Sequence, residues 1–154
     1  MTADLADLRT IARYQFGDDA AEALFPTDEP LDVTRTTSGR PRQIHAEAGR
    51  IATYERDGRF RLGIEGGRRL NNALPDTSYR VVVGEESDPF VREGRNAFAK
   101  FVQHADKTIR PRDEVLVTRD DGTLLGVGRA ELAGEGMLAF ETGMAVKMRD
   151  GVES

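Results

Sequence analysis

The 154-residue sequence contains no cysteine and no tryptophan, and it has only two histidines. Without cysteine the chain has neither disulfide bonds nor thiolate metal sites. His45 and His104 are far apart in the sequence and lack the spacing of paired metal ligands. No apolar run approaches the roughly 20 residues that cross a bilayer, and the sequence does not begin like a signal peptide. We therefore expect a cytoplasmic protein that uses no metal and no other cofactor.

Lysine is also scarce, because the sequence has only Lys100, Lys107 and Lys147 against many arginines. The formal net charge is −5, so a nucleic-acid site must be a local basic patch on an acidic protein. An acidic, lysine-poor composition is typical of halophiles, so we expect a halophile as the source, with genomic base composition as the alternative reason for the arginine excess. At molar salt the Debye length is about 3 Å, so binding to RNA would depend on shape and close hydrogen bonds.

The residue patterns of common catalytic sites are missing. Ser38 and Ser87 lie in turn-like contexts without a nucleophile-elbow pattern. The aspartate pairs at residues 18–19 and 120–121 are typical of helix caps and turns. Residues 63–67 include three glycines but lack the Lys-Ser/Thr pair of a phosphate-binding loop. We therefore expect a chain that is not an enzyme by itself.

The first half of the sequence alternates between helical and strand patterns. Apolar residues from Leu5 to Phe16 recur on one helical face, which predicts a helix that ends at Gly17. A second short helix is expected before Pro26. Strands are expected near residues 31–35, 43–45, 51–55 and 60–62, followed by a helix over residues 65–74. The polar stretch at residues 75–78 predicts a boundary, so we expect a small α+β domain over residues 1–77.

The second half is richer in strand patterns. Strands are expected at residues 79–83, 115–118, 124–130 and 143–149, with a short helix at residues 132–141. Residues 90–102 begin like a helix, break at Gly94 and are expected to continue as one strand. In that strand Asn96, Phe98 and Lys100 would share a face. We expect a second domain over residues 78–151.

The break at Gly94 is a candidate phosphate-binding turn. Glycine allows a positive φ angle or the close approach of another backbone. Three cations, Arg92, Arg95 and Lys100, surround it. Free backbone N–H groups and cations suit a nucleic-acid backbone. The alternative is a helix-to-strand corner with a solvated basic rim.

Four segments of the second half resemble the PUA domain, the small RNA-binding fold of pseudouridine synthases and archaeosine transglycosylases. They are PFVREGRNAFAKFV at residues 89–102, DEVLV at residues 113–117, VGRAEL at residues 127–132 and GMLAFETGMAVKMRDG at residues 136–151. In the first half, SGRPR at residues 38–42 and FRLGIEGGRRL at residues 60–70 resemble the small domain that precedes PUA in archaeal archaeosine transglycosylases.

The resemblance implies a fold and a relationship to an enzyme. It implies an α+β N-terminal domain followed by a mainly-β PUA pseudobarrel with short helices. The two halves together resemble the non-catalytic C-terminal region of the archaeal transglycosylase. The catalytic aspartates and zinc site of that family lie in a barrel domain, and no segment of this sequence corresponds to the barrel.

The resemblance also nominates site residues. The RNA face would comprise the Gly94 turn, the strand after it and the last strand: Arg92, Gly94, Arg95, Asn96, Lys100, Arg129, Lys147 and Arg149. Glu93 would weaken phosphate contact if it pointed the same way. Phe98 could stack on a base, although a phenylalanine in an alternating strand is more often core. Arg40 and Arg42 form a second patch, for RNA or a partner, with a solvated loop as the alternative.

Two functional hypotheses follow, with an enzyme as a third. The first is an RNA-binding protein that recognises structured RNA, with tRNA as the leading candidate, in tRNA modification. The second is a protein-binding accessory subunit of a tRNA-modifying enzyme of the archaeosine pathway, with little RNA affinity of its own. Neither hypothesis involves a membrane.

Overall fold

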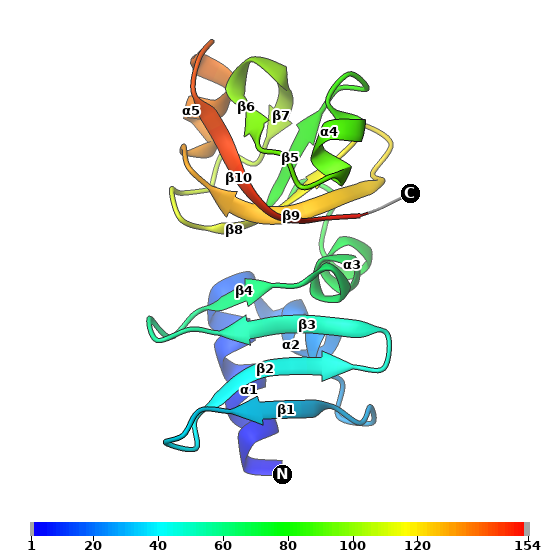
Figure 1. Cartoon of the computed structure of the whole chain (residues 1–154), viewed down its shortest axis with the longest axis vertical. Coiled ribbons are helices and arrows are strands. Elements are labelled where there is room, and N and C mark those ends of the chain that lie inside the picture. Colours follow the sequence, from blue (N-terminus) through cyan, green and yellow to red (C-terminus); the bar gives the residue numbers. More distant parts are fainter. Residues whose placement is uncertain (1, 153–154) are drawn as a thin grey trace. The chain divides into compact units, whose positions relative to one another are not determined.

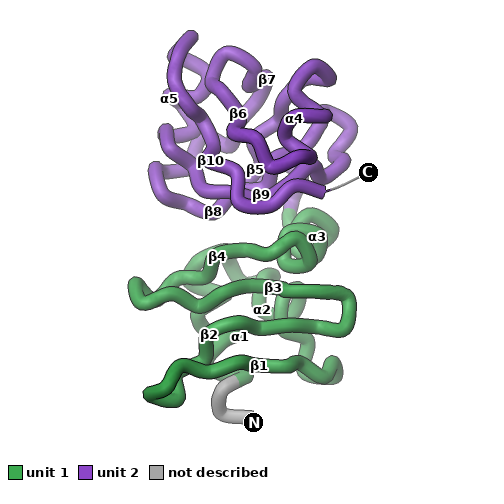
Figure 2. The backbone as a smooth tube through the Cα atoms, in the orientation of Figure 1, with its two compact units in different colours: residues 1–74 green, residues 75–154 purple. Residues whose placement is uncertain are grey.

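The computed structural model describes residues 2–152, with side chains from residue 5 onward. The chain forms two compact units, Met1–Leu74 and Pro75–Ser154 (Figure 2). The polar turn after Leu74 separates them, and each unit has its own buried core.

Unit 1 is a four-stranded antiparallel sheet with helices on one face (Figure 1). Its elements are α1 (Thr2–Phe16), α2 (Asp18–Leu24), β1 (Asp32–Arg35), β2 (Pro41–Ala46), β3 (Gly49–Tyr54), β4 (Phe60–Leu62) and α3 (Ile64–Ala73). The strands follow one another in the sheet in chain order, as short hairpins require. The apolar face of α1, with Leu8, Ala12 and Phe16, is buried as the sequence pattern predicts. The rings of Phe25 and Phe60 meet at 5.4 Å between centroids and join helix and sheet layers.

Close packing of α3 on β3 explains the glycine-rich stretch that follows β4. The Gly63 N–H donates to the Ile51 carbonyl at 2.9 Å. A Cβ atom on Gly66 would lie only 2.1 Å from that same carbonyl oxygen. The glycines therefore let a helix approach a strand backbone, which is a packing role.

Unit 2 is a six-stranded sheet with two short helices. Its elements are β5 (Arg80–Val83), α4 (Asp88–Arg92), β6 (Ala97–Phe98), the 3₁₀ helix η1 (Ala99–Phe101), β7 (Val102–Ala105), β8 (Glu114–Thr118), β9 (Leu124–Ala130), α5 (Gly134–Ala139) and β10 (Met144–Gly151). The order in the sheet is β6-β10-β9-β8-β5-β7, and only β5 and β8 pair in parallel. Because η1 joins the first and last strands of this order through three residues, the sheet must curl until its edges nearly meet. The expected fold class, an α+β domain followed by a mainly-β pseudobarrel, is confirmed.

The expected single strand after Gly94 is wrong, because η1 divides it into β6 and β7. The chain has to cross here from one edge of the sheet to the other, and the 3₁₀ turn redirects it. The predicted alternation survives in part, since Ala97 and Ala99 are buried while Phe98 and Lys100 are exposed. The expected helix at residues 132–141 is confirmed in a shorter form, as α5.

A half-buried carboxylate organises the start of unit 2. The Asp106 side chain accepts the Tyr79 N–H at 2.8 Å and both the N–H and the hydroxyl of Thr108, at 2.9 and 2.7 Å. Burial alone would raise the pKa of Asp106, but these three donors outweigh it and hold the pKa below its usual range. They also fix Tyr79, whose φ of 59° is unusual for a residue with a side chain.

Candidate nucleic-acid interface

The Gly94 turn is a Schellman motif at the end of α4. The Gly94 N–H donates to the Val91 carbonyl at 2.9 Å, and the Arg95 N–H donates to the Phe90 carbonyl at 3.0 Å. Gly94 has φ +89°, and a Cβ atom there would meet nothing within 4 Å. Glycine is therefore favoured for its left-handed backbone, and the space outside the turn is open.

Strand pairing brings three distant segments together beside this turn (Figure 1). β6 pairs with β10, with Ala97 opposite Val146. β10 pairs in turn with β9, which sets Lys147 opposite Arg129. The Asn96 Oδ1 accepts the Met148 N–H at 2.9 Å and ties the turn to β10. Cations from residues 95, 100, 129 and 147 thus come from one continuous part of the barrel.

Three of these cations are exposed: Arg95, Lys100 and Lys147. The Arg95 guanidinium lies 5.5 Å from the centroid of the Phe90 ring. Its Nε is 3.6 Å from Glu93 Oε2, but the two side chains are 67% and 64% exposed. Because such an exposed ion pair contributes at most about 1 kcal/mol, Glu93 leaves Arg95 available to a phosphate group.

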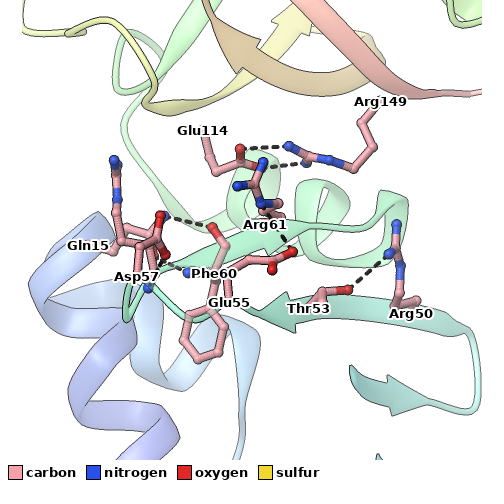
Figure 3. A network of polar contacts seen from close by, with 10 residues as sticks. Gln15, Arg50, Thr53, Glu55, Asp57, Phe60, Arg61, Glu114 and Arg149 are labelled. Carbon is pink, nitrogen blue, oxygen red and sulfur yellow. Dashed lines mark hydrogen bonds and ion pairs between the residues drawn. The ribbon is translucent and has the colours of Figure 1, made fainter. Parts of the chain in front are cut away.

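The remaining nominated arginines are engaged within the fold. The Arg92 Nε contacts Asp88 Oδ1 at 2.5 Å. Arg149 forms a two-pronged pair with Glu114, at 2.5 and 2.8 Å (Figure 3). Arg129 is half-buried and 3.5 Å from Glu131. The contacts of Arg92 and Arg149 indicate that these two residues stabilise the barrel, whereas the Arg129 contact is longer and more exposed.

Glu114 is the structural residue that the sequence patterns did not reveal. It is only 3% exposed, at the start of a strand that is buried throughout. A carboxylate in a buried strand is a signal in itself, because buried charges are almost always paired. The partner, Arg149, is 35 residues away, and only the fold brings the two together.

Phe98 is exposed rather than part of the core. Its relative exposure is 46%, and Phe90 and Phe140 are similarly exposed at 51% and 57%. The expectation that an alternating phenylalanine belongs to the core is wrong here, because β6 is a short edge strand with solvent on one side. An exposed ring of this kind can stack on a base.

Arg40 and Arg42 lie in unit 1, on and after the turn that joins β1 to β2. Both line a concavity there, and the Arg40 guanidinium lies 5.8 Å from the centroid of the Tyr54 ring. These two arginines therefore belong to a different unit from the Gly94 turn.

Neither a cluster of metal ligands nor a membrane-spanning helix is found among the residues that the structure describes. Within the side chains that the structure describes, no three histidine, aspartate or glutamate residues gather closely enough to hold a metal ion. Among the helices of residues 2–152, none is both long and apolar enough to span a membrane.

Comparison with known families defines the class of protein. Residues 79–152 match the PUA domain, and residues 6–77 match the patch-forming domain C2 of tRNA-guanine transglycosylase. The chain therefore consists of a transglycosylase-type C2 domain followed by a PUA domain. The resemblance found in the sequence is confirmed.

Relatives of high identity are archaeal enzymes. The chain is 46% identical over 147 residues to the tRNA-guanine(15) transglycosylase of Pyrococcus furiosus and 49% identical over 144 residues to that of Thermococcus kodakarensis. These alignments cover 95% and 93% of this chain and 24% of each relative. The chain therefore spans about a quarter of the length of the curated relatives it matches.

Solved structures show the same fold. A hypothetical protein from Pyrococcus horikoshii aligns with a TM-score of 0.72 and 20% identity, covering 100% of this chain and 93% of that one. A conserved PUA domain protein from Thermoplasma acidophilum aligns with a TM-score of 0.60 and 22% identity, covering 93% of this chain and 89% of that one. At these identities the likeness concerns the fold alone.

Proposed function

We propose that this chain is an RNA-binding protein that recognises tRNA, or another structured RNA, through its PUA domain in the context of tRNA modification. The observation that carries the proposal is the tandem match to C2 and PUA domains, at 46% identity to an enzyme named for its tRNA substrate. A cytoplasmic location is part of the proposal.

The proposed RNA face is centred on the Gly94 turn. Arg95, Lys100 and Lys147 are exposed and would contact phosphate groups, with Arg95 able to do so bidentately. Arg92 and Arg149 would support the barrel beneath them, given their ion pairs, and Arg129 would be less available because Glu131 lies beside it. Asn96 uses its oxygen on β10, so its amide N–H₂ would be the group that faces a 2′-hydroxyl or a base edge.

A catalytic role for the chain by itself has little support. The match is confined to the C2 and PUA domains, about a quarter of each relative's length. The sequence has no cysteine and no phosphate-binding loop. We propose a binding role for these two domains.

The match of residues 6–77 to a transglycosylase domain favours a second candidate function, an accessory subunit that binds a tRNA-modifying enzyme. Pull-down from the source cell distinguishes the two candidates. A stoichiometric protein partner with no bound RNA favours the accessory subunit, whereas recovery of RNA alone excludes it.

Polarisation titration with total tRNA at low salt tests the principal proposal directly. We expect saturable binding well above that of an acidic control protein of similar size and net charge. Binding no stronger than that control would contradict an RNA-binding role.

A further inference from the structure

A basic concavity lies in unit 1, between the turn that joins β1 to β2 and the turn that joins β3 to β4. The two turns lie at the same end of the sheet (Figure 1). Its volume is about 580 Å³. Residues 36–38 and 42 line it from the first hairpin, and Tyr54 and Arg56 line it from the second. Nothing in the proposed role of the PUA domain uses this part of the chain.

The first wall is a turn rich in hydroxyl groups. The Thr36 and Ser38 hydroxyls lie 2.9 Å apart, and Thr36 Oγ1 also accepts the Arg40 N–H at 3.1 Å. The Thr36 N–H donates to the Arg40 carbonyl at 2.8 Å and closes the turn. A turn held in this way presents its hydroxyls in fixed positions, and Thr37 and Ser38 are exposed.

The charge of the lining is strongly positive. Arg40, Arg42 and Arg56 contribute three guanidinium groups, and Glu55 is the one carboxylate among the lining residues. Glu55 is already paired with Arg61 at 3.1 Å. In the part of the chain that the structure describes, Arg42 and Arg56 have no acidic partner within ion-pair distance. On a chain with net charge −5, this concentration of cations favours the binding of an anion.

An aromatic ring stands beside the cations. The Tyr54 ring packs at 5.6 Å and 57° against the buried Phe60, which fixes its orientation. The Arg40 guanidinium also lies near this ring, 5.8 Å from its centroid. A flat ring next to a planar guanidinium is a surface on which a nucleobase can stack.

We propose that this concavity binds a nucleotide unit. Arg40, Arg42 and Arg56 hold its phosphate, the hydroxyls of the 36–38 turn donate to the phosphate oxygens, and the base lies against Tyr54. The nucleotide is either free in solution or one residue of an RNA chain, because both present the same phosphate and base. The proposal does not rest on RNA binding by the PUA domain, since the two sites use different units.

Amide chemical shifts of the ¹⁵N-labelled full chain test the proposal, with inorganic phosphate, GMP and a single-stranded RNA pentanucleotide as probes. GMP should shift the amides of residues 36–42 and 54–56 and bind more tightly than phosphate. Arg40→Ala with Arg42→Ala should weaken GMP binding by about tenfold or more, since charge-assisted hydrogen bonds are removed. Tyr54→Leu should weaken GMP binding and leave phosphate binding unchanged. If the pentanucleotide binds more tightly than GMP, the source is an RNA chain; if it does not, the source is a free nucleotide.

Arg68→Ala is the matched control, because Arg68 is an exposed arginine on α3 of the same unit. This variant should bind GMP within about twofold of the wild type. Absence of shifts with both GMP and the pentanucleotide would overturn the proposal, as would shifts that persist in the double variant. Equal affinity for phosphate and GMP would overturn the assignment of the base to Tyr54. The test also distinguishes this proposal from RNA binding by the PUA domain. The double variant Arg95→Ala, Lys100→Ala should leave the GMP-induced shifts of unit 1 intact.

Discussion

Single ion pairs in this protein differ widely in what they contribute, and burial decides the difference. Glu114 is 3% exposed and is held by two hydrogen bonds from Arg149. Arg129 and Glu131 are each about a third exposed and meet at 3.5 Å. Removing one member of a buried pair leaves an uncompensated charge, whereas exposed pairs contribute little.

Glu114→Ala should therefore destabilise the protein by about 3 kcal/mol, because it removes a buried carboxylate that accepts two hydrogen bonds from Arg149. Chemical denaturation measures the free energy of unfolding. Glu131→Ala is the control and should cost less than about 1 kcal/mol. Equal losses for the two variants would show that the burial of Glu114 has no energetic consequence.

The ion pair between Glu29 and Arg69 should make the stability of unit 1 depend on pH in the acidic range. Its carboxylate accepts two hydrogen bonds from Arg69, at 2.6 and 2.7 Å, and these lower the pKa of Glu29. Because the folded pKa is depressed, this stabilisation is present above the unfolded pKa and is lost as the pH falls through the folded value. We expect Glu29→Gln to lower stability by on the order of 1 kcal/mol at pH 7 and progressively less as the pH falls below 4.5, the ordinary pKa of glutamate. Thermal unfolding followed across this pH range measures the difference, and a parallel pH profile would contradict it.

At the scale of the elements, the helices and hairpins were predictable from local patterns. The apolar face of α1, the strands near residues 51–55 and 60–62 and the Gly94 break each follow from a few neighbouring residues. The division into β6, η1 and β7 was not predictable from local patterns, because it arises from closure of the barrel between strands that are far apart in sequence. The exposure of Phe98 and the pairing of Glu114 with Arg149 were missed for the same reason. The residues around Phe98 do not by themselves show that β6 lies at an edge of the sheet with one face in solvent.

Two glycines test the difference between packing and backbone conformation. Gly66→Ala places a Cβ atom 2.1 Å from the Ile51 carbonyl oxygen, so α3 must move away from β3. We expect a loss of stability above about 2 kcal/mol despite the better helix propensity of alanine. Thermal or chemical denaturation measures it. An unchanged or higher stability would mean that α3 does not pack as described.

Gly94→Val acts through the backbone, because its side chain meets open space but φ is +89°. We expect a loss of about 1–3 kcal/mol from strain, together with weaker RNA binding because the side chain blocks the turn. Gly94→Asn is the control, since asparagine tolerates left-handed φ better, and it should recover most of the stability. Denaturation of both variants measures the difference, and equal stability would contradict the conformational role.

At the scale of the whole molecule, an acidic chain carries two separate groups of cations. One surrounds the Gly94 turn in unit 2, and the other lines the concavity of unit 1. The fold and the family were predictable from the sequence, because the PUA segments and the C2 segments match known domains along nearly the whole chain. The free cations were less predictable, because ion pairs with Asp88, Glu114 and Glu131 occupy several of the nominated arginines. Which arginine finds a carboxylate depends on tertiary structure.

The most direct test of the RNA-binding proposal is the salt dependence of tRNA affinity for the Arg95→Ala, Lys100→Ala double variant. Both side chains are exposed, so the free energy of unfolding should change by no more than about 0.5 kcal/mol per residue. Affinity should fall, and the slope of log K against log salt should flatten by roughly 0.7–0.9 for each phosphate group that the variant no longer binds. Wild-type affinity together with a wild-type slope would contradict the proposal and place the RNA surface elsewhere on the chain.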